Sequence, residues 1–565
     1  MKKFWKIGLA VLFLSGLAGK GFSQTISTHF FGQNAWMPDT IGSASNCVDP
    51  PCLLNGKLHQ HWQNVKNSGA QIVRFGGITP DKNKPTNYQY IKMIDSIRAN
   101  GMEPVMQVPF HKYRYSAQEA ANIVQYVNIT KGRNVKYWVI GNEPDLGYAY
   151  TTAAQIAAYI RPFSSAMKNV DPTIKIIGPE CAWFNQGIIT GLTTPNGPDD
   201  ITGRDQSGKL YIDVISFHTY PFNGSQTRSQ VISKLTSAGG FKDNLAYLNQ
   251  RVTACNTAHN RTGAAALRTA VTEANINWQN SGADNLYGLG VNSFIGGQFI
   301  AEMFGIGMKS GVDFMNIWSV VEGNSVASSI GYIDPGTGNK KPAYHHFKML
   351  ADNFKGSYAD GTDNQPNVKA FGSKDAQQIC VMIMNQDLAA NLNYTVRLNT
   401  GAVSGSNALK ININAGVGAE YSGTIQNQST TLLVFNAAGV IIRKCEYSLI
   451  GNAVNNQPPT CTDYITTGTN EPGTSTVPAA SAVFEFKNIF PNPTAGKFTV
   501  QISRGPSEEE DFQVQIFNLI GQEVYNKKLT FLDGQEEIEL SPAIASGTYI
   551  LRVKEGSKDN YLVKK

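Results

Sequence analysis

The fold of this chain is decided by residues 71–109, which read QIVRFGGITPDKNKPTNYQYIKMIDSIRANGMEPVMQVP. A short β-rich apolar run opens this stretch and another closes it. Between them Ile91, Ile94 and Ile97 recur at helical spacing before the stop signal Asn100-Gly101. A strand, a helix and a second strand in this order predict a βα unit of a parallel sheet.

The same alternation runs from about residue 27 to about residue 345 and predicts eight strands. We expect them at 29–36, 71–77, 104–109, 136–140, 175–179, 212–220, 268–273 and 313–320. Ser116 with Glu119 three residues later is a capping-box pattern that opens one of the intervening helices. Eight such units predict a (β/α)8 TIM barrel. A doubly wound sheet is the weaker alternative, because no glycine-rich phosphate turn follows the first strand.

The composition changes after the last predicted barrel helix, at 342–353. Short alternating segments then predict a β-sandwich. A stretch rich in Asn, Thr, Pro, Gly and Ser predicts a flexible linker, and a small all-β unit closes the chain. The predicted domains are therefore a barrel at 25–356, a sandwich at 357–450, a linker at 451–482 and a final unit at 483–565.

The first 24 residues read as a secretory signal peptide, with a lysine-rich start, an apolar run and small residues at the end. No apolar run is long enough for a spanning helix, so we expect a mature protein that does not cross a membrane. The net charge is +6, but four lysines and no acids lie in this segment, which leaves +2 for the rest. This charge gives no indication of a nucleic-acid partner.

The 565-residue chain contains seven cysteines, an odd number that leaves disulfide pairing open. Cys47 with Cys52, and Cys445 with Cys461, are two possible pairs. The cysteines show no zinc-ribbon spacing, so we expect no metal site.

Two glutamates follow strands that lie on opposite sides of an eight-stranded ring. Glu143 lies in VIGNEP (139–144) after the fourth strand, and Glu273 in AVTEAN (270–275) at the end of the seventh. Active sites of such barrels form at the carboxyl ends of the strands. Paired carboxylates there suit glycosidic bond cleavage, in which one group donates a proton and the other attacks the anomeric carbon. The alternative is that each is a strand-end residue paired with a nearby arginine.

The Asn-Glu-Pro after strand four and the glutamate after strand seven resemble glycoside hydrolase clan A, whose retaining barrel enzymes in several families carry a trailing sandwich. The resemblance covers residues 27 to about 450. It implies that Glu143 is the general acid/base, that Glu273 is the nucleophile, and that Asn142 binds a sugar hydroxyl. It implies no cofactor.

Further strand-end residues fit the same reading. His218 and Tyr220, in SFHTYP (216–221), resemble the pair that the clan carries after strand six, where the tyrosine holds the nucleophile. Arg74 could hold Glu273 ionised, since a nearby cation lowers a carboxyl pKa, or it could form a bridge within the barrel. His111, after strand three, is as easily a loop residue as a substrate contact.

Aromatic residues near the predicted mouth could stack on sugar rings. We favour Trp278 and Trp318 as such platforms and leave Trp36 and Trp183 open. Glu180 and Glu322 also end strands and compete with the catalytic pair. Neither of these two acids lies in a recognisable motif.

The final unit contains FPNPTAG (490–496), VQIFNLIG (514–521) and SGTYILRV (546–553). These segments resemble the carboxyl-terminal sorting domain of the type IX secretion system of Bacteroidetes. The resemblance implies export through the periplasm and outer membrane by that machinery, then release or attachment at the cell surface.

The sequence thus predicts a secreted, monomeric retaining glycosidase acting on a β-linked polysaccharide or oligosaccharide, with a lean towards endo-acting β-glucanase or xylanase. The alternatives are a non-catalytic surface glycan-binding protein on an inactive barrel and an adhesive surface protein that uses the barrel as a scaffold.

Overall fold

The computed structural model describes most of the chain. The described residues are 24–35, 57–110, 115–147, 149–281, 284–322, 330–334, 337–399, 409–464, 485–490, 497–503, 511–518, 523–530, 535–541, 549–555 and 561–564. The predicted signal peptide up to residue 23, Trp36, Cys47, Cys52 and His111 lie outside them.

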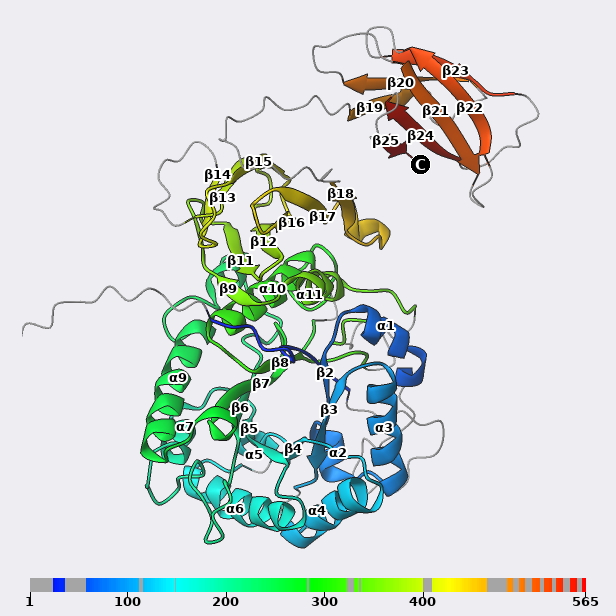
Figure 1. Ribbon diagram of the computed structural model, residues 1–565. Coiled ribbons are helices and arrows are strands. Elements are labelled where there is room, and N and C mark those ends of the chain that lie inside the picture. The colour runs from blue at the N-terminus through cyan, green and yellow to red at the C-terminus, as the bar shows by residue number, and fades with distance from the viewer. Residues whose placement is uncertain are drawn as a thin grey trace, which may run out of the picture. The chain divides into compact units, whose positions relative to one another are not determined.

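Parallel strands close into a barrel in the order β1 to β8, which confirms the predicted TIM-barrel fold (Figure 1). The barrel strands are β1 (Phe31–Asn34), β2 (Ile72–Phe75), β3 (Glu103–Val108), β4 (Tyr137–Ile140), β5 (Lys175–Cys181), β6 (Val214–Thr219), β7 (Arg268–Ala274) and β8 (Phe314–Ile317). Each overlaps a predicted strand. The barrel closes through the parallel pairing of β1 with β8.

Helices surround the barrel. They are α1 (Trp62–Asn67), α2 (Ile78–Lys82), α3 (Asn87–Ala99), α4 (Ala117–Val124), α5 (Pro144–Gly147), α6 (Ala153–Val170), α7 (Gln186–Leu192), α8 (Arg228–Ser233), α9 (Phe241–Ala258), α10 (Phe294–Lys309) and α11 (Pro342–Asn353). A π-helical turn, η2 (Gln125–Thr130), continues α4, and 3-10 turns lie at η1 (Lys57–Gln60), η3 (Gly263–Ala265) and η4 (Ala453–Asn455). Ser116 and Glu119 form the predicted capping box at α4.

Two sheets follow the barrel and form the expected sandwich, a mixed four-stranded sheet with one parallel pair and an antiparallel six-stranded sheet. One contains β10 (Gly361–Asp363), β14 (Leu409–Ile413), β13 (Leu392–Arg397) and β15 (Glu420–Ile425); the other contains β18 (Thr460–Asp463), β17 (Ile441–Ser448), β16 (Ser429–Asn436), β12 (Gln378–Asn385), β11 (Val368–Lys374) and β9 (Ser357–Ala359). A second hydrophobic core fills the space between the two sheets.

The sandwich packs on the barrel through α10 and α11, and both belong to one compact unit, residues 1–466. Side chains of the six-stranded sheet, such as Phe371 and Leu432, join the core that covers the barrel. Gly305 of α10 lies so close to Phe371 that an added Cβ would sit 2.8 Å from its ring. The glycine therefore allows the helix to approach the sheet.

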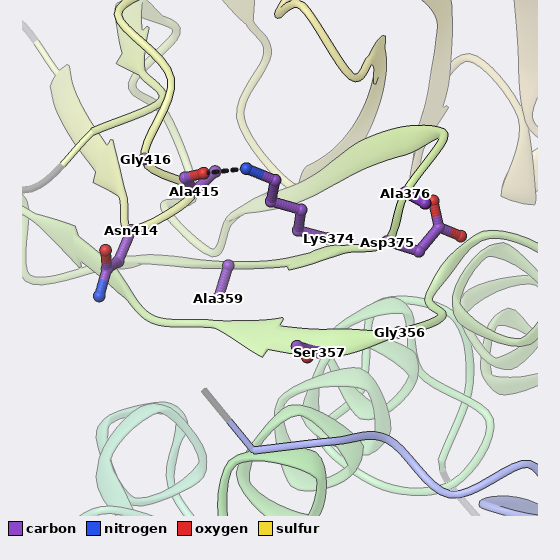
Figure 2. A pocket seen from close by; sticks show the side chains of 9 residues that line it. All are labelled: Gly356, Ser357, Ala359, Lys374, Asp375, Ala376, Asn414, Ala415 and Gly416. Carbon is purple, nitrogen blue, oxygen red and sulfur yellow. Dashed lines mark hydrogen bonds between the residues drawn. The ribbon is translucent and has the colours of Figure 1, made fainter. Parts of the chain in front are cut away.

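A cleft of about 590 Å³ lies in the sandwich near β9 and β11 (Figure 2). The ammonium group of Lys374 donates to the carbonyl of Ala415 at 2.6 Å within it. The residues around this cleft are far along the chain from both predicted catalytic glutamates, so it is separate from the site described below.

The sandwich extends beyond its predicted end. η4 and β18 lie in the range predicted as linker, and β18 pairs with β17. Cys445 and Cys461 form a disulfide across this pair, so one of the two possible cystine pairs is present. The Asn- and Pro-rich composition of this stretch is typical of a linker and gave no sign of the edge strand, which the disulfide joins to β17.

Residues 467–565 form a second compact unit. Its strands are β19 (Glu485–Phe490), β20 (Lys497–Ser503), β21 (Asp511–Asn518), β22 (Glu523–Thr530), β23 (Gln535–Glu539), β24 (Tyr549–Glu555) and β25 (Tyr561–Lys564). They form two antiparallel sheets, as the alternating sequence predicted. In the described part of the chain, no helix is both long and apolar enough to span a membrane.

Candidate active site

Side chains that point into the barrel change from apolar to polar along each strand. Ile72 and Ala270 belong to an apolar cluster at the amino-terminal end. Two residues later on the same strands stand Arg74 and Thr272, which are buried and polar. Because alternate residues of a strand face the same side, these polar groups form a layer directly above the apolar cluster. This layer is the floor of the candidate active site.

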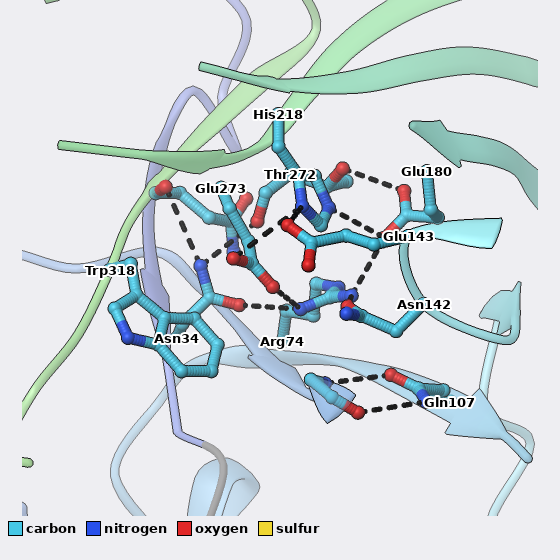
Figure 3. Close-up of polar contacts among 12 residues, drawn as sticks. Asn34, Arg74, Gln107, Asn142, Glu143, Glu180, His218, Thr272, Glu273 and Trp318 are labelled. Atoms are coloured by element: carbon cyan, nitrogen blue, oxygen red, sulfur yellow. Dashed lines mark hydrogen bonds and ion pairs between the residues drawn. The ribbon is translucent and has the colours of Figure 1, made fainter. Parts of the chain in front are cut away.

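Glu143 and Glu273 meet at the carboxyl end of the barrel (Figure 3). Glu273 belongs to β7, and Glu143 comes three residues after β4 ends. A carboxylate oxygen of each lies within 4.8 Å of the other. The Glu143 side chain is 17% exposed and that of Glu273 is 5% exposed, so Glu143 is nearer to solvent.

Arg74 connects most of the site from beneath. Its Nη1 donates to Oε1 of Glu273 at 2.9 Å and to Oδ1 of Asn34 at 3.0 Å. Its Nη2 donates to Oδ1 of Asn142 at 2.8 Å and pairs with Oε2 of Glu180 at 2.8 Å. The guanidinium is fully buried, and its fork-shaped donors fix the orientation of each partner.

Tyr220 and His218 hold the two glutamates from the β6 side. The Tyr220 hydroxyl donates to Oε2 of Glu273 at 2.6 Å. His218 Nδ1 lies 2.9 Å from Oε1 of Glu143 and 3.5 Å from Oε2 of Glu273. Burial and neighbouring carboxylates raise the pKa of the Tyr220 hydroxyl well above its usual value, so it remains a donor.

The charges around Glu273 act in opposite directions. Burial, the largest cause, and the charge of Glu143 raise the pKa of Glu273 above its usual value, and His218, Arg74 and the Tyr220 hydroxyl offset part of this rise by favouring the carboxylate. Burial alone would lower the pKa of His218, but Glu273, Glu143 and Glu180 raise it to about 10. His218 is therefore an imidazolium at neutral pH, and it donates to Glu143.

Glu143, His218 and Glu273 form a cluster whose donor atoms are close enough together for a metal ion. Within this cluster His218 Nδ1 pairs with a carboxylate oxygen of each glutamate.

Glu180 and Glu322 occupy two different environments. Glu180 is fully buried below the catalytic pair, and its pKa, which burial would raise, is lowered to about 2 by Arg74 and His218. Glu322 lies on the β8 side, where its Oε2 accepts a hydrogen bond from the Trp318 indole at 3.0 Å. Burial raises the pKa of Glu322 to about 7, and the charge of Glu273 contributes.

The predicted aromatic platforms differ in exposure. Trp318 is 9% exposed and lies beside the catalytic pair. Trp278, in the loop after β7, is 58% exposed, and Trp183, after β5, is 47% exposed. Tyr287, also after β7, is 63% exposed and was not singled out from the sequence.

The sequence reasoning also missed three polar residues of the floor. Asn34 orients Arg74 and donates to the carbonyl of Thr272 at 2.9 Å. The hydroxyls of Ser216 and Thr272 each donate to Oε1 of Glu180 at 2.6 Å. The available signal was a polar residue within an otherwise apolar strand, two residues after an inward-facing apolar one.

One curated relative of this chain is a glycosidase. A stretch of 228 residues is 25% identical to Endoglucanase A of Paenibacillus lautus, covering 34% of this chain and 31% of that enzyme. The chain therefore spans about a third of the length of this relative.

Solved structures share the fold. The α-L-arabinofuranosidase of Thermotoga maritima superposes with a TM-score of 0.50 at 17% identity, over 73% of this chain and 97% of that one. The family 51 α-L-arabinofuranosidase AbfB of Bifidobacterium longum gives 0.51 at 13% identity, over 74% and 98%. Both superpositions extend beyond the length of a barrel alone.

At the other end of the chain, residues 488–565 match the secretion system C-terminal sorting domain family. This confirms the predicted sorting domain and indicates export to the cell surface or the medium. The protein thus combines a barrel and sandwich with the fold of glycoside hydrolases and a carboxyl-terminal domain that belongs to the secretion-sorting family.

Proposed function

We propose that the protein is a retaining glycoside hydrolase that cleaves a β-linked polysaccharide outside the cell. The observation that carries this proposal is the distance between the Glu143 and Glu273 carboxylates, which is within 4.8 Å. Retaining glycosidases hold their two carboxyl groups about 5 to 5.5 Å apart, whereas inverting enzymes need about 6.5 to 9.5 Å for an intervening water.

The surroundings of the two glutamates suit two different roles. Glu273 would attack the anomeric carbon, because Arg74 and Tyr220 hold its oxygens and favour its ionised form. Glu143, more exposed and beside the mouth, would protonate the departing oxygen. Water activated by the same Glu143 would then release the sugar from Glu273. The first displacement releases the protonated leaving group and the second adds water, so the anomeric configuration is retained.

The rim of the barrel supports an extended substrate. Trp278, Trp183 and Tyr287 lie in loops that follow barrel strands, and their rings are about half exposed or more. Exposed aromatic faces in such loops can stack on successive sugar rings. Together with the similarity to an endoglucanase, this favours an endo-acting β-glucanase or xylanase, with β-glucan tested first. The sorting domain would pass the enzyme to the type IX secretion machinery.

The test is reducing-sugar release by the full-length protein from β-glucan, xylan, mannan and arabinan. We expect activity on one polymer class, and a loss of about 10⁴-fold or more in kcat in Glu273→Ala, because the covalent step disappears. The matched control is Glu322→Gln, which alters a neighbouring acid without removing the nucleophile.

Proton NMR of the first product then reports the stereochemistry. Release of the β-anomer supports double displacement. An α-anomer, or full activity in Glu273→Ala, would contradict the assigned mechanism.

A further inference from the structure

Glu180 is a fully buried acid of the site that no step of the proposed reaction uses. Its side chain has no exposed surface. Its oxygens contact groups from three other strands: Arg74 of β2 at 2.8 Å, Ser216 of β6 at 2.6 Å and Thr272 of β7 at 2.6 Å. His218 Nε2 lies 3.4 Å from Oε2. A carboxylate this deep cannot touch substrate, yet it contacts both cations of the site.

The backbone of Glu180 adopts a conformation that is unfavourable for a residue with a side chain. Its φ is 61°, in the left-handed region that residues with a side chain rarely adopt. The pairing of β5 with β6 is also irregular between Gly178 and Cys181. Bulges and left-handed residues of this kind cluster at functional sites, where they aim a side chain that a regular strand would misdirect.

The Glu180 carbonyl adds a direct link to the catalytic acid. It accepts a hydrogen bond from the backbone N–H of Glu143 at 3.0 Å. Glu143 itself has a φ of 47°. The two acids therefore fix each other's backbone as well as sharing His218.

We infer that Glu180 is a positioning residue whose negative charge holds Arg74 and His218 as cations beneath the site, so that these two orient Glu273 and Glu143. The inference rests on the proposed function for its catalytic meaning. The stabilisation of the two cations by Glu180 does not depend on that function, because two cations buried side by side need a negative charge nearby.

Charged groups from several elements surround His218 and affect its pKa. Glu143 and Asp145 follow β4, Glu180 belongs to β5 and Glu273 to β7, while Arg74 of β2 is the opposing cation. Of these acids, Glu180 and Glu273 each contact both His218 and Arg74, and Glu180 is the one that takes no part in the proposed reaction. Removing its charge should therefore lower the pKa of His218 and of Glu273.

The test is Glu180→Gln, which keeps the shape and removes the charge. The amide oxygen can still accept from Arg74 and His218, and the amide nitrogen can donate to the Ser216 and Thr272 hydroxyls. The protein is labelled at its eight histidines, and each is titrated by NMR; His218→Gln identifies the His218 signal. This readout needs no substrate.

We expect the His218 midpoint of the native protein to lie above about 8.5, against about 6.5 for an unperturbed histidine. In Glu180→Gln it should fall by about one pH unit or more. Glu180→Asp keeps the charge, and Ser216→Ala leaves the carboxylate in place, so both should stay within about 0.5 unit of the native value.

A native midpoint near 6.5, or the same midpoint in Glu180→Gln, overturns the inference. A native midpoint near 6.5 overturns it even if the variant does not fold. With a cleaved polymer in hand, the acid limb of the pH profile of kcat, which reports Glu273, should move to lower pH in Glu180→Gln, with KM unchanged. If no polymer is cleaved while the titration behaves as expected, the proposed function fails and the charge assignment stands.

Discussion

At the scale of single residues, the hydroxyl of Tyr220 has an effect on Glu273 that kinetics can measure. It donates to Oε2 of Glu273, the group proposed to attack the sugar. Loss of this bond leaves the charge of Glu273 less stabilised, so its pKa should rise. The hydroxyl should also need to turn from Glu273 to the substrate ring oxygen or to water once the covalent bond forms.

Tyr220→Phe should therefore reduce kcat roughly 100-fold, the size of effect that removal of one aligned donor has in other active sites. The acid limb of the pH profile should move to higher pH, because Glu273 then ionises less readily. Steady-state kinetics on the polymer identified above measure both effects. An acid limb that moves to lower pH would contradict the assigned role of the hydroxyl.

At the scale of elements, β18 is held to the sandwich mainly at its edge. It pairs with β17 alone, its residues are exposed, and the Cys445–Cys461 disulfide crosses this pair. An exposed edge strand of four residues has little buried surface to stabilise it.

The double substitution Cys445→Ala with Cys461→Ala should lower the free energy of unfolding of the first unit by about 3 kcal/mol, as expected for a closed loop of this length. Denaturant unfolding measures the change. A reducing agent should destabilise the native protein by a similar amount and leave the double variant unaffected. Neither β17 nor β18 contributes a residue to the candidate active site, so kcat should not change.

At the scale of the whole molecule, two buried histidines of α11 lie at the junction of barrel and sandwich. His346 Nδ1 donates to the Pro342 carbonyl at 2.8 Å, and its Nε2 accepts from the Thr430 hydroxyl of β16 at 2.8 Å. This arrangement requires the neutral imidazole. Burial lowers the pKa of His346 to about 4 and that of His345 to about 3.

The junction should therefore be sensitive to acid. Below about pH 6.5 these two histidines are protonated in the unfolded chain but stay neutral in the folded protein. Each of them therefore lowers the free energy of unfolding by about 1.4 kcal/mol for every pH unit of acidification. This effect ends when the pH reaches the folded pKa of that histidine. Thermal unfolding between pH 7 and 4 measures the slope. His346→Gln should flatten it, and a slope unchanged by this variant would contradict the assignment.

The sequence by itself determined the barrel, the sandwich and the sorting domain, because each depends on local pattern: alternating strands and helices, period-two strands, and a specific set of tail segments. It also determined Glu143 and Glu273 as candidates, since strand-end position in such a barrel already places residues at the mouth. For Arg74 the sequence left two readings open, a partner of Glu273 and a bridge within the barrel.

Only the tertiary structure decided which charged residues of the site contact one another. The β-ladder irregularities at Glu180, His218 and Glu273 each turn a side chain in a way that strict alternation does not predict. Glu180 therefore appeared as a competitor for catalysis in the sequence and lies buried beneath the site in the structure. Its partners come from strands far apart in the chain, and such a contact leaves no periodic signal in the sequence.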